Sequence, residues 1–449
     1  MSQQALEFKH TPSLAWVVLA MLLIAGALLV GVRGTTRAMT GSGDLRMLYA
    51  AGNVWLNGGN PYVFDEVISV YRADGGDPEN KLTPQMFVTL YPPSTLPVLA
   101  PLGLFNFQQA KFVLVLINLI GVAALVWLSA QICAIGREGQ AWLWVAALVL
   151  VLTPVSSTMA MGQITIPVVA LLMLGLLWER RGRSVLAGVT LGLATAIKPQ
   201  LVGMLVIWLA WRGNWYAFFA ACVVGFVLAG IAVLRMELAD ANWWPHMIEN
   251  LQAFKNGGNG DPTQSNPAGW WKLMNLPVML HVFTENRAFV GLVSWSVFGL
   301  LMLGTALLGR SLRRPDGLKE SQSAVTSDDL IVPSMMVLAC LIPVYHRHYD
   351  AVSLLVPLCW VVMRCREGRV DGPVKLVSAT ILLFYIPNVV VLIHSVINPR
   401  LPASIVESVW WRASAMNLLV WSMLMMAGGL LWAMARLVNQ QMAQAPPST

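Results

Sequence analysis

Charged side chains are scarce in this sequence. Asp, Glu, Lys and Arg together make up 11% of the 449 residues, whereas hydrophobic residues make up 57%. A soluble domain carries about 25% charged residues, so the composition excludes an ordinary soluble protein and indicates a chain surrounded by lipid. The formal net charge of +7 does not predict a nucleic-acid partner, because the basic residues stand in short segments between apolar runs.

Cysteine is also rare. The five cysteines are Cys133, Cys222, Cys340, Cys359 and Cys365. All lie in apolar runs or at their expected cytoplasmic ends, so we predict no structural disulfide. No Cys/His cluster has zinc-ligand spacing, and no pair of carboxylates requires a metal, so neither a metal nor another cofactor is predicted. A cleavable signal peptide is not evident either, because the first apolar run is long enough to span a bilayer and lacks a clear cleavage site.

Long apolar runs are what the sequence has in abundance. Because about 20 apolar residues span the hydrocarbon core of a bilayer, they predict an all-α integral membrane protein with about 12 crossings. We interpret residues 1–449 as a single polytopic membrane domain without a separate soluble domain. The expected crossings lie near residues 14–32, 96–132, 141–157, 164–178, 184–197, 201–211, 215–234, 288–309, 330–345, 351–363, 373–394 and 413–435.

The basic residues predict the orientation of the chain. Cytoplasmic loops of membrane proteins are enriched in Lys and Arg. With the N-terminus in the cytoplasm, every basic cluster becomes cytoplasmic: Arg137, Arg180–Arg183, Arg212, Arg310–Lys319 and Arg364–Arg369. The C-terminus is then also cytoplasmic, with residues 436–449 as a tail. The external face receives two large loops, residues 33–95 and 235–287, and a shorter one at 395–412.

Residues 184–211 are too short for two full crossings and contain Lys198 and Pro199 near their middle. These roughly 28 residues cover about 42 Å as helix, whereas two crossings need about 60 Å. We predict two short helices whose turn lies below the outer surface, enclosed by protein around a wet cavity, because neither an ammonium nor unpaired backbone can face lipid. Residues 330–363, interrupted by polar residues 345–350, have the same character.

Asp44 and Lys198 are the first two candidates for chemistry. Asp44 follows the first crossing, in Gly41-Ser42-Gly43-Asp44, and its carboxylate could accept a proton from an acceptor hydroxyl. The alternative is an aspartate that merely caps the next helix. Lys198 suits the phosphate of a lipid carrier, although a lysine can also extend its amine to the interface.

A third candidate is the polar cluster in the interruption at residues 345–350. Arg347 and a protonated histidine, His346 or His348, could bind a phosphate, and a neutral histidine could position an acceptor hydroxyl. The alternative is an interfacial turn in which Asp350 pairs with Arg347.

Three turn-like segments contain possible substrate contacts. They are Asn60-Pro61-Tyr62, Tyr91-Pro92-Pro93 and Gly162-Gln163. In isolation each is ordinary turn chemistry, but Gln163 falls in an expected tight external turn, where its amide could bind a substrate. The tryptophan pairs at 243–244 and 270–271 fit an interfacial aromatic belt better than sugar stacking.

Taken in order, these segments resemble the family-87 glycosyltransferases of the membrane-embedded GT-C superfamily. The resemblance extends from residue 14 to about residue 360, and beyond it only hydropathy is similar. It rests on Gly43-Asp44, Tyr49-Ala50-Ala51, residues 57–62, Tyr91-Pro92-Pro93 with Pro97 and Pro101, Gly162-Gln163, the run 187–199 ending in Lys198-Pro199, and His348-Tyr349 leading into residues 354–357.

The resemblance implies a GT-C-like bundle of about 12 transmembrane helices with short external helices, in the plasma (inner) membrane of a bacterium. It implies that one sugar moves, with inversion, from a polyprenyl-phosphate carrier to a glycolipid or polysaccharide acceptor at the external face. Asp44 matches the catalytic base. Lys198 and His348 match basic positions around the donor phosphate, with Arg347 as a further cation and His346 as an alternative to His348. Relatives act on mannose or arabinose, and no cofactor is implied.

Two other function classes remain open. An O-antigen polymerase or ligase also has about a dozen crossings, but it places its key basic residues in a large late loop, whereas the largest loops here are early and central. A transporter or lipid flippase often contains halves related by an internal repeat, and no repeat is evident here. Sugar transfer in vesicles without any gradient would separate an enzyme from a carrier.

Overall fold

The computed structural model describes residues 14–41, 43–74, 88–136, 139–266, 269–312, 326–387 and 389–444. Within these residues the chain is helical and forms no strand; one isolated bridge pairs Leu273 with Arg347. The predicted all-α class is confirmed. Ser42, Arg137 and most of the basic segment 310–319 lie outside the described residues.

The helices follow one another with short connections, and η marks a 3-10 or π helix. The first half of the chain forms α1 (Leu14–Ala27), η1 (Leu28–Gly34), α2 (Thr35–Thr40), α3 (Leu45–Leu56), α4 (Phe64–Ala73), η2 (Pro93–Thr95), α5 (Leu96–Leu99), η3 (Ala100–Leu104), α6 (Phe107–Ile132), α7 (Gln140–Val151), α8 (Thr153–Met161), α9 (Thr165–Arg180), α10 (Ser184–Ile197), α11 (Pro199–Trp211) and α12 (Trp215–Leu238). The second half forms α13 (Trp243–Lys255), η4 (Trp270–Lys272), α14 (Leu276–Leu280), α15 (Arg287–Ser311), α16 (Asp328–Cys340), η5 (His348–Leu354), α17 (Leu355–Arg366), α18 (Gly372–Leu382), η6 (Leu383–Tyr385), α19 (Val389–Leu392), η7 (Ile393–Ile397), η8 (Asn398–Arg400), α20 (Ala403–Val406), α21 (Val409–Ser414) and α22 (Leu418–Gln444).

Five helices of the described residues are long and apolar enough to cross a membrane. They are Leu14–Thr40, Phe107–Ile132, Trp215–Leu238, Arg287–Ser311 and Leu418–Ala443. Two bent pairs, α7 with α8 (49°) and α18–η6 with α19–η8 (61°), raise the number to seven if each is one span. The chain is therefore a multi-pass helical protein, but twelve full crossings are not confirmed.

Several boundaries differ from those predicted, for local reasons. The expected crossing at 96–132 is divided into three elements, α5, η3 and α6, because Pro97 and Pro101 confine the first part to short turns and Asn106 starts α6 with a capping box to Gln109. The first helix continues to Thr40 rather than ending at 32, and the expected loop 33–95 holds α3 and α4. Most of the expected tail, residues 436–449, is helical, because α22 continues to Gln444.

The predicted pair of short helices is confirmed: α10 ends at Ile197 and α11 begins at Pro199. Lys198, between them, is only 2% exposed. Because Pro199 has no backbone N–H, carbonyls of the preceding turn lose a helical donor. Two hydroxyls supply replacements: Ser94 donates to the Ala196 oxygen at 2.7 Å, and the Thr95 hydroxyl lies 3.1 Å from the Ala196 oxygen and 3.2 Å from the Ile197 oxygen.

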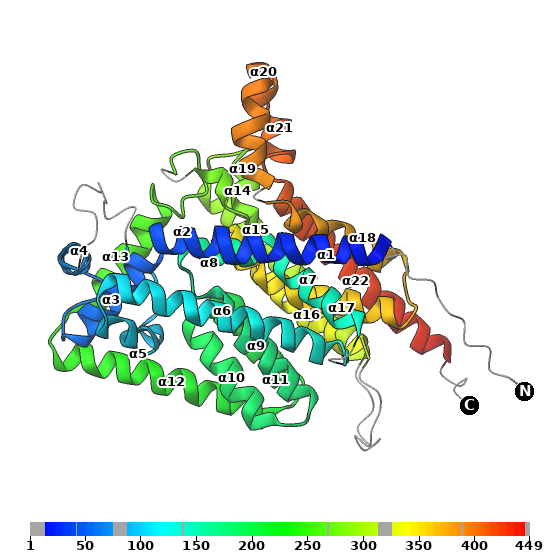
Figure 1. Cartoon of the computed structure of the whole chain (residues 1–449), viewed down its shortest axis with the longest axis horizontal. Coiled ribbons are helices and arrows are strands. Elements are labelled where there is room, and N and C mark those ends of the chain that lie inside the picture. The colour runs from blue at the N-terminus through cyan, green and yellow to red at the C-terminus, as the bar shows by residue number, and fades with distance from the viewer. Residues whose placement is uncertain are drawn as a thin grey trace, which may run out of the picture.

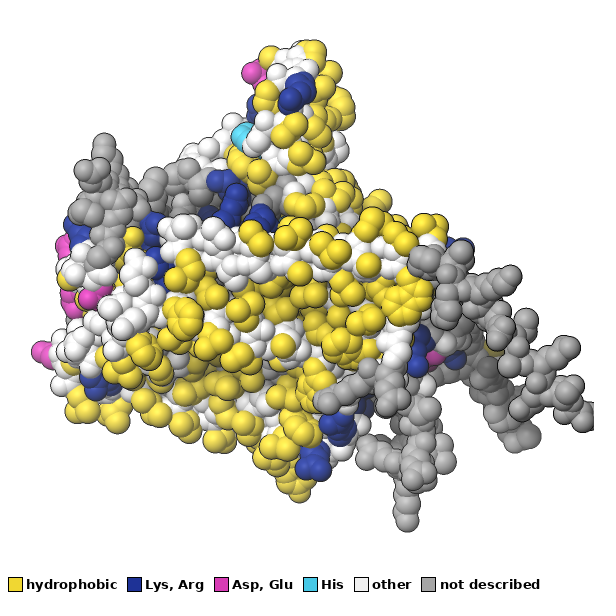
Figure 2. All heavy atoms as spheres, viewed as in Figure 1, with side chains coloured by type: hydrophobic (Ala, Val, Ile, Leu, Met, Phe, Trp, Pro, Cys, Tyr) yellow, Lys and Arg dark blue, Asp and Glu magenta, His cyan; other side chains and the backbone are white. Residues whose placement is uncertain are grey.

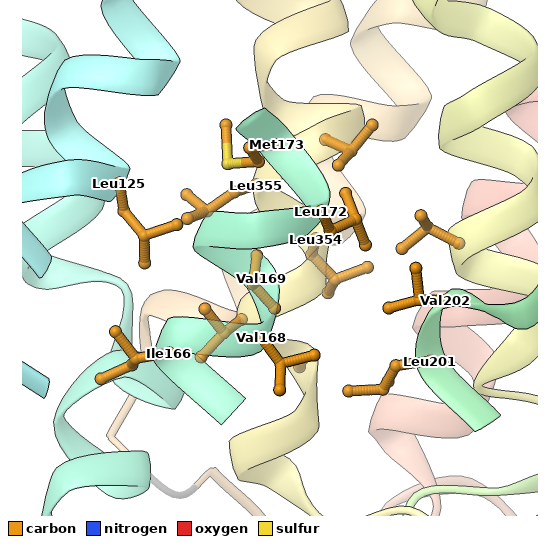
Figure 3. Close-up of a cluster of buried hydrophobic side chains, with 14 of the residues drawn as sticks. Leu125, Ile166, Val168, Val169, Leu172, Met173, Leu201, Val202, Leu354 and Leu355 are labelled. Atoms are coloured by element: carbon orange, nitrogen blue, oxygen red, sulfur yellow. The ribbon is translucent and has the colours of Figure 1, made fainter. Parts of the chain in front are cut away.

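Helix α9 occupies the centre of the main hydrophobic core. In Figure 3 its apolar side chains meet side chains of α6, α11 and the η5–α17 segment. Helix α10 packs directly against α12 through Gly188 and Gly192, where an added Cβ would overlap the backbone of Ala217 and Ala221. The core therefore joins the short α10–α11 pair to the long helices around it. The labelled core residues are Leu125, Ile166, Val168, Val169, Leu172, Met173, Leu201, Val202, Leu354 and Leu355.

The surface and the ends of the bundle fit a membrane protein. Hydrophobic side chains cover the middle of the face in Figure 2. Helix α1 begins and α22 ends on the right in Figure 1, whereas α3, α4 and α13 lie on the left. Basic loops meet at one end, where Arg180 bonds the Ile132 oxygen at 2.9 Å and Arg364 pairs with Asp328 at 3.2 Å. All five cysteines are free.

The turn between α10 and α11 gives a first test. Thr95→Val should lower the unfolding free energy by about 1–3 kcal/mol, because it removes the hydroxyl partner of the buried Ile197 carbonyl, whereas the Ala196 carbonyl keeps its bond from Ser94. Thermal unfolding of the purified protein in detergent measures the change. Thr40→Val is the matched control, since the exposed Thr40 hydroxyl bonds a carbonyl of its own helix. Equal melting temperatures for the two variants would contradict the role of Thr95.

Candidate active site

A cavity of about 250 Å³ lies between the first helix, the loop that follows α13 and the start of η5. Four cations line it: Arg33 and Arg37 from η1 and α2, Lys272 from η4, and Arg347 before η5. No acidic side chain belongs to the described lining. Arg33 and Arg37 are one turn apart and so share a face of the helix. In Figure 2 a dark-blue group of Lys and Arg side chains lies between the positions that Figure 1 labels α2 and α14.

The loop that follows α13 brings Lys272 and Arg347 together. The Met274 N–H donates to the His346 oxygen at 3.0 Å, beside the bridge between Leu273 and Arg347. Partial burial, followed by repulsion from Arg347, lowers the pKa of Lys272 from its ordinary value. A bound anion would relieve this repulsion, so the cavity suits a negatively charged group.

Asp261 stabilises the same loop. Its buried carboxylate accepts from Arg287 at 2.9 Å, from the Gly257 N–H at 2.6 Å and from the Thr263 hydroxyl at 2.7 Å. Burial alone would raise the pKa of Asp261, but these hydrogen bonds outweigh burial and hold the pKa below its ordinary value. The Asn259 oxygen in this loop lies 3.4 Å from the Arg347 guanidinium. These hydrogen bonds therefore hold residues 257–263 of the loop in place beside Arg347 of the cavity lining.

The two candidate histidines have different surroundings. His346 is fully buried, with Nδ1 3.1 Å from Asp350 and Nε2 3.2 Å from the Cys340 oxygen, and it does not line the cavity. His348 does line it, with Nε2 3.2 Å from the Thr153 hydroxyl. Thr153 donates its own proton to the Phe384 oxygen at 2.7 Å, so its oxygen accepts from His348. His348 Nδ1 is buried and has no hydrogen-bond partner among the described residues.

Lys198 forms a buried ion pair. Its ammonium lies 2.9 Å from Asp350 Oδ1 and 2.7 Å from the Thr165 hydroxyl, and both charged side chains are at most 4% exposed. Asp350 therefore pairs with Lys198 and His346 rather than with the Arg347 side chain, the pairing considered from the sequence. Lys198 is enclosed by protein as predicted, but it is not part of the cavity lining. Its charge is balanced by Asp350, so direct binding of a phosphate would require this pair to open.

Asp44 lies at the margin of the cavity. Its backbone N–H donates to the oxygen of Met161, a lining residue, at 2.9 Å. Its carboxylate interacts electrostatically with Arg347, another lining residue. Asp44 precedes α3 at the capping position, yet its side chain forms no cap. Instead, Oδ2 accepts a hydrogen bond from the Gln163 amide at 2.7 Å.

Consecutive hydrogen bonds link Gln163, Tyr91 and Tyr62 to Asp44. The Tyr91 hydroxyl donates to Gln163 Oε1 at 3.0 Å, and the Tyr62 hydroxyl donates to the Tyr91 backbone oxygen at 2.9 Å. All three are buried, and none belongs to the cavity lining. The three residues selected from separate turns thus lie in one hydrogen-bonded series that ends at Asp44.

Some lining residues were missed by the sequence analysis. Arg33 and Arg37 were placed beyond the end of a crossing, although their i, i+4 spacing after an apolar run is a recognisable signal. Trp271 was assigned to an aromatic belt, whereas it lines the cavity and stacks on His394 with ring centroids 4.1 Å apart. Lys272 was missed because it belongs to no recognisable sequence motif. Its ammonium lies 5.0 Å from the centroid of the Trp271 ring.

A comparison with family models decides the class of this protein. The model of glycosyltransferase family 87 matches residues 89–326, just over half of the chain. The chain belongs to glycosyltransferase family 87. It is therefore a glycosyltransferase, as predicted. The matched segment of this glycosyltransferase contains Tyr91, Gln163 and Lys198 but not Asp44 or residues 346–350. No curated protein and no solved structure matches the chain.

The buried ion pair gives a second test. Lys198→Met should destabilise the glycosyltransferase by about 3–5 kcal/mol, because it leaves the Asp350 carboxylate uncompensated in the core. Adding Asp350→Asn should restore much of that stability, as measured by thermal unfolding in detergent. Arg436→Met is the control: it breaks the Arg436–Asp371 pair, whose side chains are 45% and 26% exposed, and should cost less than about 1 kcal/mol. A double variant no more stable than Lys198→Met would contradict this account.

Proposed function

We propose that this glycosyltransferase moves one sugar from a polyprenyl-phosphate carrier to a glycolipid or polysaccharide acceptor at the external face of a bacterial inner membrane. The observation that carries the proposal is the position of the Asp44 carboxylate beside a cavity with four cations and no acid in its described lining. A base next to an anion site is what transfer from a sugar phosphate requires. The expectation of about 12 crossings remains part of this proposal.

The donor phosphate occupies the basic cavity in this mechanism. Arg347, Arg33, Arg37 and Lys272 balance its negative charge, which grows as the bond to the sugar breaks. Arginine suits this role because its planar guanidinium can donate two parallel hydrogen bonds to phosphate oxygens. The Trp271 ring beside Lys272 supplies an apolar wall, and the His348 ring lines the same cavity.

The transfer itself is an inverting single displacement. The acceptor oxygen attacks the anomeric carbon from the face opposite the phosphate, and its proton passes to the Asp44 carboxylate. The bond between the anomeric carbon and the phosphate oxygen breaks, and its electron pair leaves with the polyprenyl phosphate. Late proton transfer in an oxocarbenium-like transition state suits a weak base such as aspartate. No metal is needed in this scheme.

In this proposal Lys198 and His346 do not contact the donor. They act through Asp350. Their interactions with Asp350 position the start of η5, from which Arg347 and His348 reach the cavity. This replaces the direct phosphate contacts expected from the sequence, because the charge of Lys198 is already balanced by Asp350. The polymerase or ligase and transporter alternatives receive no specific support from the cavity.

The base can be tested directly. Asp44→Asn should remain folded and bind the donor, but its turnover should fall by about 10²-fold or more, because amide nitrogen cannot accept the proton. The assay uses labelled polyprenyl-phosphate mannose and arabinose with a membrane lipid extract, in vesicles without a gradient. Asp65→Asn, an exposed acid on α4, is the matched control and should keep normal turnover. Near-normal turnover of Asp44→Asn would exclude it as the base.

The orientation can be tested with thiol labelling. Gln264→Cys, an exposed position in the second external loop, should react with an impermeant maleimide added to intact cells. Native Cys365, exposed at the end of α17, should react only after the cells are opened. Labelling of Cys365 in intact cells would reverse the proposed orientation.

A further inference from the structure

Asp44 lacks the hydrogen bond that an aspartate at its position usually makes. A capping aspartate normally accepts from a backbone N–H of its own helix and stabilises it by about 1 kcal/mol. Here the carboxylate turns to Gln163, with Nε2 2.7 Å from Oδ2. Oδ1 has no hydrogen-bond partner among the described residues. Among the described residues, which exclude the nearby Ser42, only one oxygen is therefore held, and Asp44 is partly exposed.

The chemistry of the neighbours fixes the orientation of the Gln163 amide. A carboxylate can only accept hydrogen bonds, so the NH₂ group must face Asp44. The amide oxygen then faces the Tyr91 hydroxyl, 3.0 Å away, which donates to it. With the amide reversed, its oxygen would face the carboxylate and two acceptors would be in contact. Tyr91 thus stabilises the one orientation in which Gln163 can donate to Asp44.

The backbone of Gln163 is fixed as well. Gly162 ends α8 with a positive φ of 68°. Glycine adopts this left-handed conformation more readily than other residues. The Gln163 N–H donates to the Thr158 oxygen at 3.0 Å, and its own oxygen accepts from the Asn118 amide at 3.0 Å. The side chain is 4% exposed. Gln163 is therefore rigid and turned toward Asp44, not toward the cavity.

We infer that Gln163 and Tyr91 are positioning residues for Asp44 rather than substrate contacts. Tyr91 holds the Gln163 amide, and the amide fixes the Asp44 carboxylate through Oδ2, with Oδ1 directed toward the acceptor hydroxyl. This inference rests on the proposed function of Asp44 as the base. It assigns a role in the reaction to two buried residues that no substrate touches.

Other titratable groups also act on Asp44. Arg347, Tyr345 and Tyr349, near the start of η5, interact with it electrostatically, as does Tyr91 itself. Arg46, on the helix that Asp44 precedes, lies 3.4 Å from the Gly41 oxygen. A substitution at Gln163 leaves the chemical identity of all these groups unchanged. An altered titration of Asp44 therefore reports on the group at position 163.

The test is the pH dependence of Asp44 in Gln163→Glu. Two carboxyl groups at hydrogen-bond distance cannot both ionise easily. They share one proton instead. Dicyclohexylcarbodiimide modifies only the protonated carboxyl group, so mass spectrometry of the labelled Asp44 peptide measures protonation without any activity assay. We expect the labelling midpoint to move up by at least one pH unit. The rise of turnover with pH should shift in the same direction, because the base must be unprotonated.

Asn250→Asp is the matched control. It also converts a buried amide to an acid, but its amide donates to the Tyr62 oxygen at 2.9 Å, away from Asp44. In this variant, the labelling midpoint of Asp44 should equal that of the wild type. A wild-type midpoint in Gln163→Glu would overturn the inference.

Tyr91→Phe provides a second variant if Gln163→Glu fails to fold. It should lower kcat roughly 3- to 10-fold, corresponding to the loss of one hydrogen bond, and leave the donor KM unchanged. Unchanged kcat in this variant would overturn the role of Tyr91. The two proposals fail differently: active Asp44→Asn would exclude Asp44 as base, whereas inactive Asp44→Asn with wild-type titration in Gln163→Glu would exclude only the positioning role.

Discussion

The ion pair between Lys198 and Asp350 is the interaction on which the site depends. It joins two interrupted segments, the break between α10 and α11 and the start of η5, at the centre of the bundle. Removing either partner would leave a charge in the core at a cost of several kcal/mol. Because Asp350 also binds His346, the pair determines where the next two residues, Arg347 and His348, enter the cavity. A contact with almost no solvent exposure thus positions the groups that face the ligand.

The site separates charges of opposite sign in two adjoining regions. On one side, the neutral Gln163 amide donates to the Asp44 carboxylate and Tyr91 donates to that amide, and among the described residues no cation forms a salt bridge with Asp44. On the other, Arg33, Arg37, Lys272 and Arg347 face a shared space. Had one of these cations paired directly with Asp44, the carboxylate would be a poorer base and the cavity a weaker anion site. Gln163 supplies a hydrogen bond without a charge and so avoids both effects.

Length and polarity alone predicted the α10–α11 break, because 28 residues cannot cross a bilayer twice and a lysine cannot face lipid. They did not predict the partner of Lys198, which is 152 residues away. Nothing in the sequence around Asp350 distinguishes Lys198 from the nearby Arg347. Proline and asparagine near residues 97–106 also divide an apolar run that hydropathy treats as one crossing.

The candidate residues were easier to find than their roles. Asp44, Gln163, Tyr91 and Tyr62 were each selected from turn-like segments, yet their order in one hydrogen-bonded series depends on long-range packing. The basic cavity escaped notice because its cations come from three distant segments. Arg33 and Arg37 lie in a helix that extends beyond the expected end of the crossing, and Lys272 lies in a loop without a motif.

The continuous helix from Leu14 to Thr40 sets the depth of the cavity relative to the lipid. At 1.5 Å per residue it is about 40 Å long, whereas the hydrocarbon core is about 30 Å thick. If its first turn lies at the inner edge of the hydrocarbon, Arg33 reaches the outer edge and Arg37 stands one turn beyond, at the depth of the phospholipid headgroups. A carrier anchored by its hydrocarbon chain would present its phosphate at that level. In the proposed function, the length of the first helix therefore makes the hydrophobic thickness of the bilayer part of donor recognition.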